Sequence, residues 1–204
     1  GDMGAHLMDF PVWALELGLP TRVETKHTLW GGDDDPWDYK RPEVLTSYPL
    51  SAVTYYEFGN AKGGPVKLTW MDGGLAPPTI RGLPEGRIME EEGGVVFNGD
   101  KGQLLHDTYG AKPTLIGEEA IARGAKIPVS LPRIRDEAHE QNWARAIRGQ
   151  EGISNPFEVA CDLNEAMLLG IVAMRAGAPI EYDGAAGRIT NIPEANALLS
   201  RTYR

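Results

Sequence analysis

Residues 50–71 read LSAVTYYEFGNAKGGPVKLTWM, and this stretch decides the fold. Its first part, residues 50–58, is rich in β-branched and aromatic residues, which favour a pleated, half-buried strand. In its last part, apolar and other residues alternate from Val66 to Met71, which predicts a second strand. Gly63-Gly64-Pro65 lies between the two runs. We therefore expect an antiparallel hairpin here.

Patterns on either side of this hairpin predict further elements. Strands are expected at residues 21–29 and 180–182, and a second hairpin at residues 95–105 turns at Asn98-Gly99-Asp100-Lys101-Gly102. Residues 73–92 contain many Gly, Pro and Glu residues and are expected to run over the surface. Helices are expected at residues 2–17, bent at Pro11, and at 136–148, 155–176 and 191–203. The helix at 155–176 is apolar from Leu163 through Met174, which predicts burial on most of its sides.

The order of these elements predicts an α+β fold. The strands cluster in the middle of the chain and the helices near its ends, which favours a large, mainly antiparallel open sheet with helices packed on one face. At 204 residues, the chain fits a single domain over residues 1–204. Large side chains are expected on both faces of the strands, so a second subunit is expected to cover the other sheet face and form a homo-oligomer: Tyr55, Tyr56, Trp70 and Met71.

Composition excludes several classes of partner. The formal net charge of −9 argues against nucleic acid, which would require clustered Lys and Arg. The longest apolar run, residues 166–173, is far too short to cross a membrane. The single cysteine, Cys161, lies in an apolar run and is expected to be a buried core thiol. Nothing in the chain distinguishes a cytoplasmic from a periplasmic location.

The first residues, Gly1-Asp2-Met3-Gly4-Ala5-His6, contain a candidate acid-base pair. In a helix, Asp2 and His6 lie one turn apart on the same face, and Asp9 and Trp13 extend this stripe. A carboxylate can orient an imidazole, whose pKa near neutrality suits proton transfer. On spacing alone, the ordinary interpretation is more common: Asp2 favours the helix dipole and His6 packs half-buried. A metal site at Asp2, His6 and Asp9 is not favoured.

Other candidate sites are excluded by their spacing. Residues 94–101 lack the Gly-Lys-Ser/Thr ending of a phosphate loop, and no Gly-x-Gly-x-x-Gly follows a strand. The acidic residues 33–38 lack the glycine and the distal glutamate of a calcium loop, so we expect a solvated loop. His27, His106 and His139 are expected to be structural, and His139, Trp143 and Ile147 form a stripe that predicts a packing face.

Several motifs together resemble the carboxy-terminal domain of the Gfo/Idh/MocA oxidoreductase family. They are Gly-Asp-Met-Gly-Ala-His at residues 1–6, Trp70-Met71-Asp72-Gly73-Gly74, Gly99-Asp100-Lys101-Gly102, and Ile-Thr-Asn-Ile-Pro-Glu-Ala-Asn at residues 189–196. The resemblance spans essentially the whole chain. It implies that the chain is the carboxy-terminal half of a longer enzyme, with an NAD(P)-binding Rossmann domain in the other half and an open sheet that mediates oligomerisation.

The resemblance also implies roles for two residues. His6 would give or take the proton of a substrate hydroxyl, and Asp2 would hold the substrate or tune His6. The sequence departs from the family in two ways: the nucleotide-binding half is absent, and so is the family's Glu-Lys-Pro lysine, because Lys112-Pro113 occurs in a different context. This chain alone is therefore expected to be inactive.

Our leading hypothesis is the substrate domain of an NAD- or NADP-dependent oxidoreductase that acts on a sugar or polyol hydroxyl. Hydride would pass between the carbinol carbon and the nicotinamide, with the cofactor bound mainly outside this chain. One alternative is a related glycosidase that uses tightly held NAD. Another is a non-catalytic assembly or binding domain in which the Asp2–His6 pair has no catalytic role.

Overall fold

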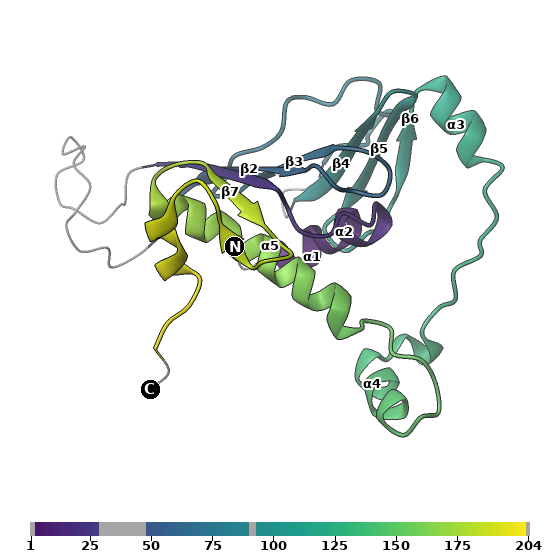
Figure 1. Ribbon diagram of the computed structural model, residues 1–204. Helices are drawn as coiled ribbons and strands as arrows, with labels where there is room; N and C mark the ends of the chain where they lie inside the picture. Colours follow the sequence, from purple (N-terminus) through teal and green to yellow (C-terminus); the bar gives the residue numbers. More distant parts are fainter. Residues whose placement is uncertain (1–2, 29–47, 90–92, 203–204) are drawn as a thin grey trace. The chain divides into compact units, whose positions relative to one another are not determined.

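The 50–71 stretch forms the expected hairpin in the computed structural model, which describes residues 3–28, 48–89 and 93–202 (Figure 1). Strands β2 (Ala52–Phe58) and β3 (Val66–Met71) pair antiparallel, with Tyr55 opposite Thr69. On its other side, β2 pairs with β1 (Arg22–His27), and β7 (Ile180–Asp183) and β8 (Arg188–Ile189) continue the sheet. The order is β3-β2-β1-β7-β8, and every pairing is antiparallel.

One face of this sheet packs against a long helix. Alternate residues of β2 are buried, as the period of a strand requires: Ala52, Thr54, Tyr56 and Phe58. They share a core with helix α5 (Phe157–Ala176), whose buried residues include Ala166, Leu169 and Ala173. Helix and sheet are also joined by a polar contact, because the Thr25 hydroxyl donates to the Gly170 carbonyl at 2.9 Å. This face of the sheet is therefore closed by α5.

The amino-terminal helix is interrupted, as expected, although the break lies earlier than Pro11. Helix α1 (Gly4–Leu7) is followed by α2 (Asp9–Ala14), and Met8 separates them. Pro11 has no N–H to donate to the Leu7 carbonyl, which explains why the helical ladder fails in this turn. Met8 and Val12 are buried in the core of the sheet and α5, so both short helices are anchored.

A second sheet forms in the middle of the chain. Strands β4 (Gly94–Gly99) and β5 (Gly102–Asp107) make the second expected hairpin, and β6 (Thr114–Ile116) pairs with β5. Helix α3 (Glu118–Gly124) follows β6. Further along lie a 3₁₀ turn (Arg135–Glu137) and helix α4 (His139–Ile147), where a longer helix over residues 136–148 was expected.

The last segment is pinned by two asparagines. Asn191 accepts the Glu181 N–H and donates to the Pro179 carbonyl, and Asn196 accepts the Ile189 N–H and donates to the Ile189 carbonyl. Between them begins a 3₁₀ helix (Pro193–Leu198), where a longer α-helix was expected. The motif at residues 189–196 thus ties the end of the chain to β7 and β8.

Three expectations about burial are wrong. Cys161 is exposed, because the buried face of α5 carries Leu163, Ala166 and Leu169, and position 161 lies on another face. For the same reason Leu168 is half exposed, and α5 is not buried on most sides. The stripe of His139, Trp143 and Ile147 on α4 is exposed and does not form a packing face in the structure: Trp143 and Ile147 are both largely accessible.

The α+β prediction is confirmed, with antiparallel strands shared between a five-stranded and a three-stranded sheet. The chain divides into two compact units: unit 1 comprises Gly1–Ile80 and Asp162–Arg204, and unit 2 comprises Arg81–Cys161. A single domain over residues 1–204 stays a prediction. In the described ranges, no helix combines the length and apolar character that a bilayer span needs. The acidic residues 33–38 and Asp2 lie outside the described residues.

Candidate functional site

His6 lies on α1 with its side chain exposed to solvent. Helix α1 is fixed in place because Gly4, at its start, and Met8, just after its end, are buried. His6 is therefore accessible to a molecule from outside. The ordinary interpretation of the sequence, that His6 packs half-buried, is wrong, because its side chain is exposed. Its predicted partner Asp2 lies outside the described residues, so the pair stays a prediction.

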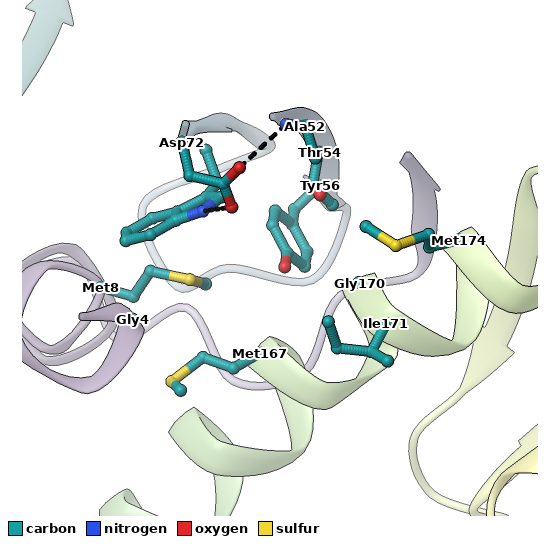
Figure 2. Close-up of a pocket in the computed structure, with 11 residues that line it drawn as sticks. Gly4, Met8, Ala52, Thr54, Tyr56, Asp72, Met167, Gly170, Ile171 and Met174 are labelled. Carbon is teal, nitrogen blue, oxygen red and sulfur yellow. Dashed lines mark hydrogen bonds between the residues drawn. The ribbon is translucent and has the colours of Figure 1, made fainter. Parts of the chain in front are cut away.

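A small cavity in unit 1 lies beside the same helix. Gly4 and Met8 line it from α1 and the turn that follows. The remaining lining residues come from β2, from β3 and the residue after it, and from α5 (Figure 2): Ala52, Thr54, Tyr56, Trp70, Asp72, Met167, Gly170, Ile171 and Met174. Its volume is about 40 Å³. A cavity of this size holds a few waters, whereas pockets for small-molecule ligands usually measure roughly 300–1,000 Å³. His6 is not among the lining residues.

Asp72 supplies the carboxylate of this cavity and organises the end of β3. One carboxylate oxygen accepts the Ala52 backbone N–H at 2.8 Å, and the other accepts the Trp70 indole N–H at 3.0 Å (Figure 2). The next residue, Gly73, has φ +68°, and a Cβ there would lie 2.0 Å from the Leu50 carbonyl oxygen. Only glycine fits this position. The Trp70-Met71-Asp72-Gly73-Gly74 motif thus has a structural role in this fold.

Tyr56 supplies the cavity's phenol. Burial raises the pKa of the Tyr56 hydroxyl, the charge of Asp72 raises it further, and a hydrogen bond with Thr54 acts in the opposite direction. A phenol whose pKa lies above its usual value of about 10 stays protonated at neutral pH. Tyr56 can therefore donate a hydrogen bond but cannot act as a general base under these conditions.

Asp9 is a second titratable group on the amino-terminal helices. It begins α2 and is partly buried, and this burial raises the pKa of its carboxyl above the usual value. The sequence placed Asp9 in the same helical stripe as His6. The break at Met8 divides that stripe between α1 and α2, and Trp13 at its far end is exposed.

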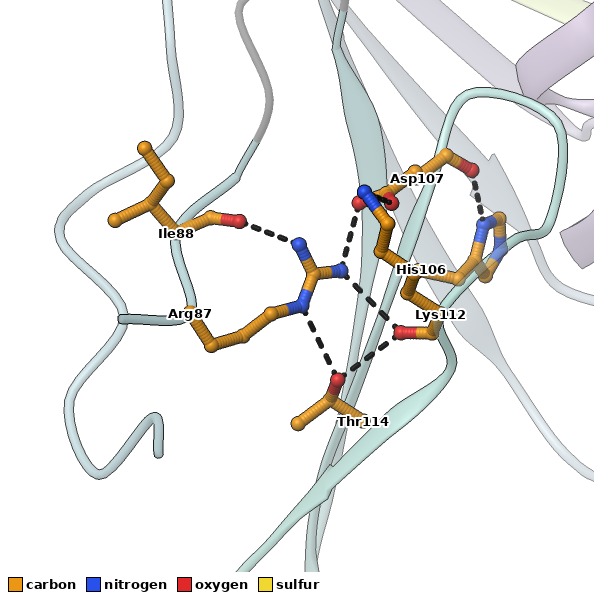
Figure 3. A network of polar contacts seen from close by, with 6 residues as sticks. All are labelled: Arg87, Ile88, His106, Asp107, Lys112 and Thr114. Carbon is orange, nitrogen blue, oxygen red and sulfur yellow. Dashed lines mark hydrogen bonds and ion pairs between the residues drawn. The ribbon is translucent and has the colours of Figure 1, made fainter. Parts of the chain in front are cut away.

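Unit 2 contains a separate polar network around Arg87 (Figure 3). Its guanidinium donates to Asp107 Oδ1 at 2.7 Å, to Thr114 Oγ1 at 3.2 Å and to the Ile88 carbonyl at 2.6 Å. Lys112 Nζ lies 3.5 Å from the other Asp107 oxygen. Burial opposes ionisation of Asp107, but Arg87 and Lys112 outweigh it and lower the pKa of this carboxyl. The network fastens the loop before β4 to β5 and β6, which is a structural function.

His106 adjoins this network and is buried on β5. Its Nδ1 lies 2.8 Å from the Asp107 carbonyl oxygen, and its ring packs beside Phe97. These contacts match the structural role expected for His106. Arg87 and Asp107 carried no signal in the sequence, because Arg87 lies in a loop without periodicity.

Among the described residues there is no metal centre, and the cavity beside α1 does not fit a dinucleotide. No three His, Cys, Asp or Glu side chains among them are grouped as metal ligands. The cavity of about 40 Å³ is far smaller than NAD(P), and the sequence has no glycine-rich fingerprint after a strand. This cavity therefore does not fit a nicotinamide cofactor.

Comparison with known proteins adds no family assignment. The chain matches no protein-family model, and no curated protein is significantly similar to it. The geometry of the site is thus the basis for the function proposed next.

Proposed function

We propose that this chain is the substrate and oligomerisation domain of an NAD(P)-dependent oxidoreductase of the Gfo/Idh/MocA type. It would act on a hydroxyl of a sugar or polyol, with the nucleotide-binding domain supplied by another part of the protein or by another chain. The domain would be inactive alone. NAD(P) would be bound mainly outside this chain, since the cavity of about 40 Å³ is too small for it.

One observation carries the proposal: His6 is exposed on the short helix α1, and residues on either side of it are buried. Gly4 and Met8, which lie before and after His6 in the sequence, are buried, so the backbone that carries the imidazole is fixed while the imidazole itself is accessible to solvent. A general acid or base must be accessible to its substrate and held in a defined position. His6 would accept the proton of the substrate hydroxyl during oxidation and return it during reduction.

In the proposed assembly, a second copy covers the outer face of the five-stranded sheet. Tyr55 on β2 is exposed there, and Val53 opposite Met71 adds partly buried apolar surface beside it. Charged pairs flank this patch, with Lys26 Nζ 2.8 Å from Glu24 on β1. These charged residues lie on the central strand β1, so the apolar patch on β2 and β3 has a charged border on one side, as polar residues border the apolar part of protein interfaces.

The test of the catalytic role uses the intact protein encoded by the gene. NAD(P)H formation is measured with a panel of sugars and polyols, and NAD(P) affinity is measured separately. His6→Gln is expected to lower kcat by roughly 10²–10⁴-fold with cofactor affinity unchanged, because only proton transfer is lost. The matched control is His139→Gln, an exposed histidine on α4, which should leave both values unchanged.

Two results would contradict the proposal. An intact protein that binds neither NAD nor NADP would exclude the oxidoreductase. Equal losses of kcat and cofactor affinity in His6→Gln would exclude its role as the acid-base group. The first result would favour a non-catalytic assembly domain, the second candidate, which the small volume of the cavity also favours.

A further inference from the structure

The amino-terminal helices expose a tryptophan as well as His6. Trp13 on α2 is 56% exposed, although tryptophan is a residue that proteins bury to a large extent on average. A single exposed apolar side chain needs no explanation by itself. The informative feature is where Trp13 lies relative to His6, the proposed acid-base group.

Helices α1 and α2 keep a common helical phase across the break between them. The backbone of Met8 stays in the right-handed helical region, with φ −75° and ψ −20°. The Met8 N–H donates to the Gly4 carbonyl at 2.8 Å, and the Val12 N–H donates to the Met8 carbonyl at 3.0 Å. The rotation per residue of an α-helix therefore applies from α1 into α2.

His6, Asp9 and Trp13 lie on one face of this helical segment. At 3.6 residues per turn, these three positions fall within about 60° of one another around the axis. The buried residues of the segment fall on the opposite side, which agrees with this phase: Gly4, Met8, Pro11 and Val12. The face that carries His6, Asp9 and Trp13 is thus turned away from the core, and His6 and Trp13 are both exposed.

The spacing on this face fits one small molecule. His6 and Trp13 are two turns apart, which is about 10 Å along the axis at a rise of 1.5 Å per residue. Long side chains on a helix point back towards its N-terminus, so the indole of Trp13 covers the turn on the side of His6. A sugar ring that rests on the indole can therefore bring one of its hydroxyls to the imidazole.

Trp13 and Asp9 also have the chemistry that a sugar ring requires. A hexose ring has a face of C–H groups, and such a face packs well on the electron-rich face of an indole. Asp9 is partly buried, and this burial raises the pKa of its carboxyl. A carboxylate that has lost part of its water gains free energy when it accepts hydrogen bonds from sugar hydroxyls. An open-chain polyol offers hydroxyls but no rigid C–H face.

We propose that Trp13 determines substrate specificity by stacking on a sugar ring, one hydroxyl of which reaches His6 while Asp9 accepts a hydrogen bond from another. The enzyme would therefore prefer ring sugars to open-chain polyols. This inference rests on the proposed function, because it requires that the substrate reacts at His6.

The test measures NAD(P)H formation by the intact protein with glucose, galactose and mannose, and with the hexitol that corresponds to each. Trp13→Ala is expected to raise KM for the ring sugars roughly tenfold and to change kcat by less than about twofold, because stacking contributes equally in the ground state and the transition state. Trp13→Phe keeps an aromatic face and should recover most of the loss, and KM for the hexitols should stay the same in both variants. The matched control is Trp143→Ala, which changes a 61% exposed tryptophan on α4 and should leave every KM unchanged.

The outcomes separate this inference from the proposed function. An active Trp13→Ala variant with an unchanged KM for ring sugars would overturn the inference and leave the oxidoreductase standing, and so would a loss confined to NAD(P) affinity. If the intact protein oxidises neither hexoses nor hexitols, the proposed function fails, and calorimetric titration with the same sugars tests the stacking site directly. Binding of a ring sugar that Trp13→Ala weakens would then support the site, whereas the absence of binding would overturn it. Circular dichroism checks that each variant is folded.

Discussion

The contact between α5 and β2 leads to a prediction at Gly170. A Cβ added there would lie 2.4 Å from the Tyr56 hydroxyl oxygen and 3.3 Å from Thr54 Cγ2. Tyr56 is buried in the core, so its ring cannot swing away from the helix into solvent. Overpacking of this kind costs typically ~1–3 kcal/mol, whereas alanine gains about 1 kcal/mol over glycine inside a helix. We therefore expect Gly170→Ala to lower the free energy of unfolding by up to about 2 kcal/mol.

Combining Gly170→Ala with Tyr56→Phe tests whether the Tyr56 hydroxyl is the group that the new methyl group meets. Without the hydroxyl, the new methyl group would meet the ring carbon that carried it at 3.4 Å, which is ordinary van der Waals contact. The clash with the hydroxyl is then relieved, and the helix propensity of alanine is opposed only by the 3.3 Å contact with Thr54 Cγ2. In the Tyr56→Phe background, Gly170→Ala should raise the free energy of unfolding by up to about 1 kcal/mol. The coupling energy between the two sites is then the clash that Tyr56→Phe removes, about 1–3 kcal/mol.

Urea unfolding of the four proteins in this cycle measures the coupling. Far-UV circular dichroism follows the whole chain, and hydrogen exchange at the amides of β2 reports on unit 1 alone. Additive effects of the two substitutions would refute the argument, because the Tyr56 hydroxyl would then not be what keeps position 170 a glycine. A coupling of the opposite sign would refute it equally.

Two further predictions concern backbone and charge. Gly73→Ala should destabilise the chain by about 2–4 kcal/mol, because the backbone at this position has φ +68° and the new Cβ would overlap the Leu50 carbonyl oxygen. Thermal unfolding measures the loss of stability, and an unchanged Tm would contradict the prediction. Arg87 and Lys112 lower the pKa of Asp107, so its stabilising contribution is full above the ordinary aspartate pKa of about 4 and is lost as pH falls through the lowered value. Protection from hydrogen exchange at residues 81–89, taken relative to the intrinsic rate at each pH, should fall in acid in the wild type. Asp107→Asn should show low protection at neutral pH as well. Equal protection in both proteins at neutral pH would exclude this role.

Local patterns in the sequence were sufficient to predict most elements. Both hairpins, the helix over residues 155–176 and the interruption near Pro11 follow from strand alternation, turn residues and a missing N–H, all of which act within a few residues. The short elements β6, β8 and α3 were not predicted. The strands β6 and β8 have three and two residues, too few to show an alternating pattern, and α3 with seven residues is too short to show a clear helical period. Their stability comes from neighbours distant in sequence.

The candidate site shows the same division. The sequence drew attention to His6 and to the segment containing Asp72, but it gave no indication that Asp72 caps Ala52 and Trp70 or that Tyr56 faces Gly170. Tyr56 and Gly170 are more than a hundred positions apart in the chain. Nor could the sequence predict the Arg87–Asp107 pair, since the arginine lies in a loop without periodicity.

By itself, then, the sequence determined the α+β class and the type and position of the longer elements, because backbone propensity and hydrophobic period are local properties. Tertiary structure alone decided which faces are covered. The spacing of Trp143 and Ile147 predicted a packing face, and the apolar run around Cys161 predicted burial, yet all three side chains are exposed. An apolar stripe indicates that a helix face is suited to burial. Burial itself requires a second element packed against that face, and only the three-dimensional arrangement of the chain decides whether such an element is there.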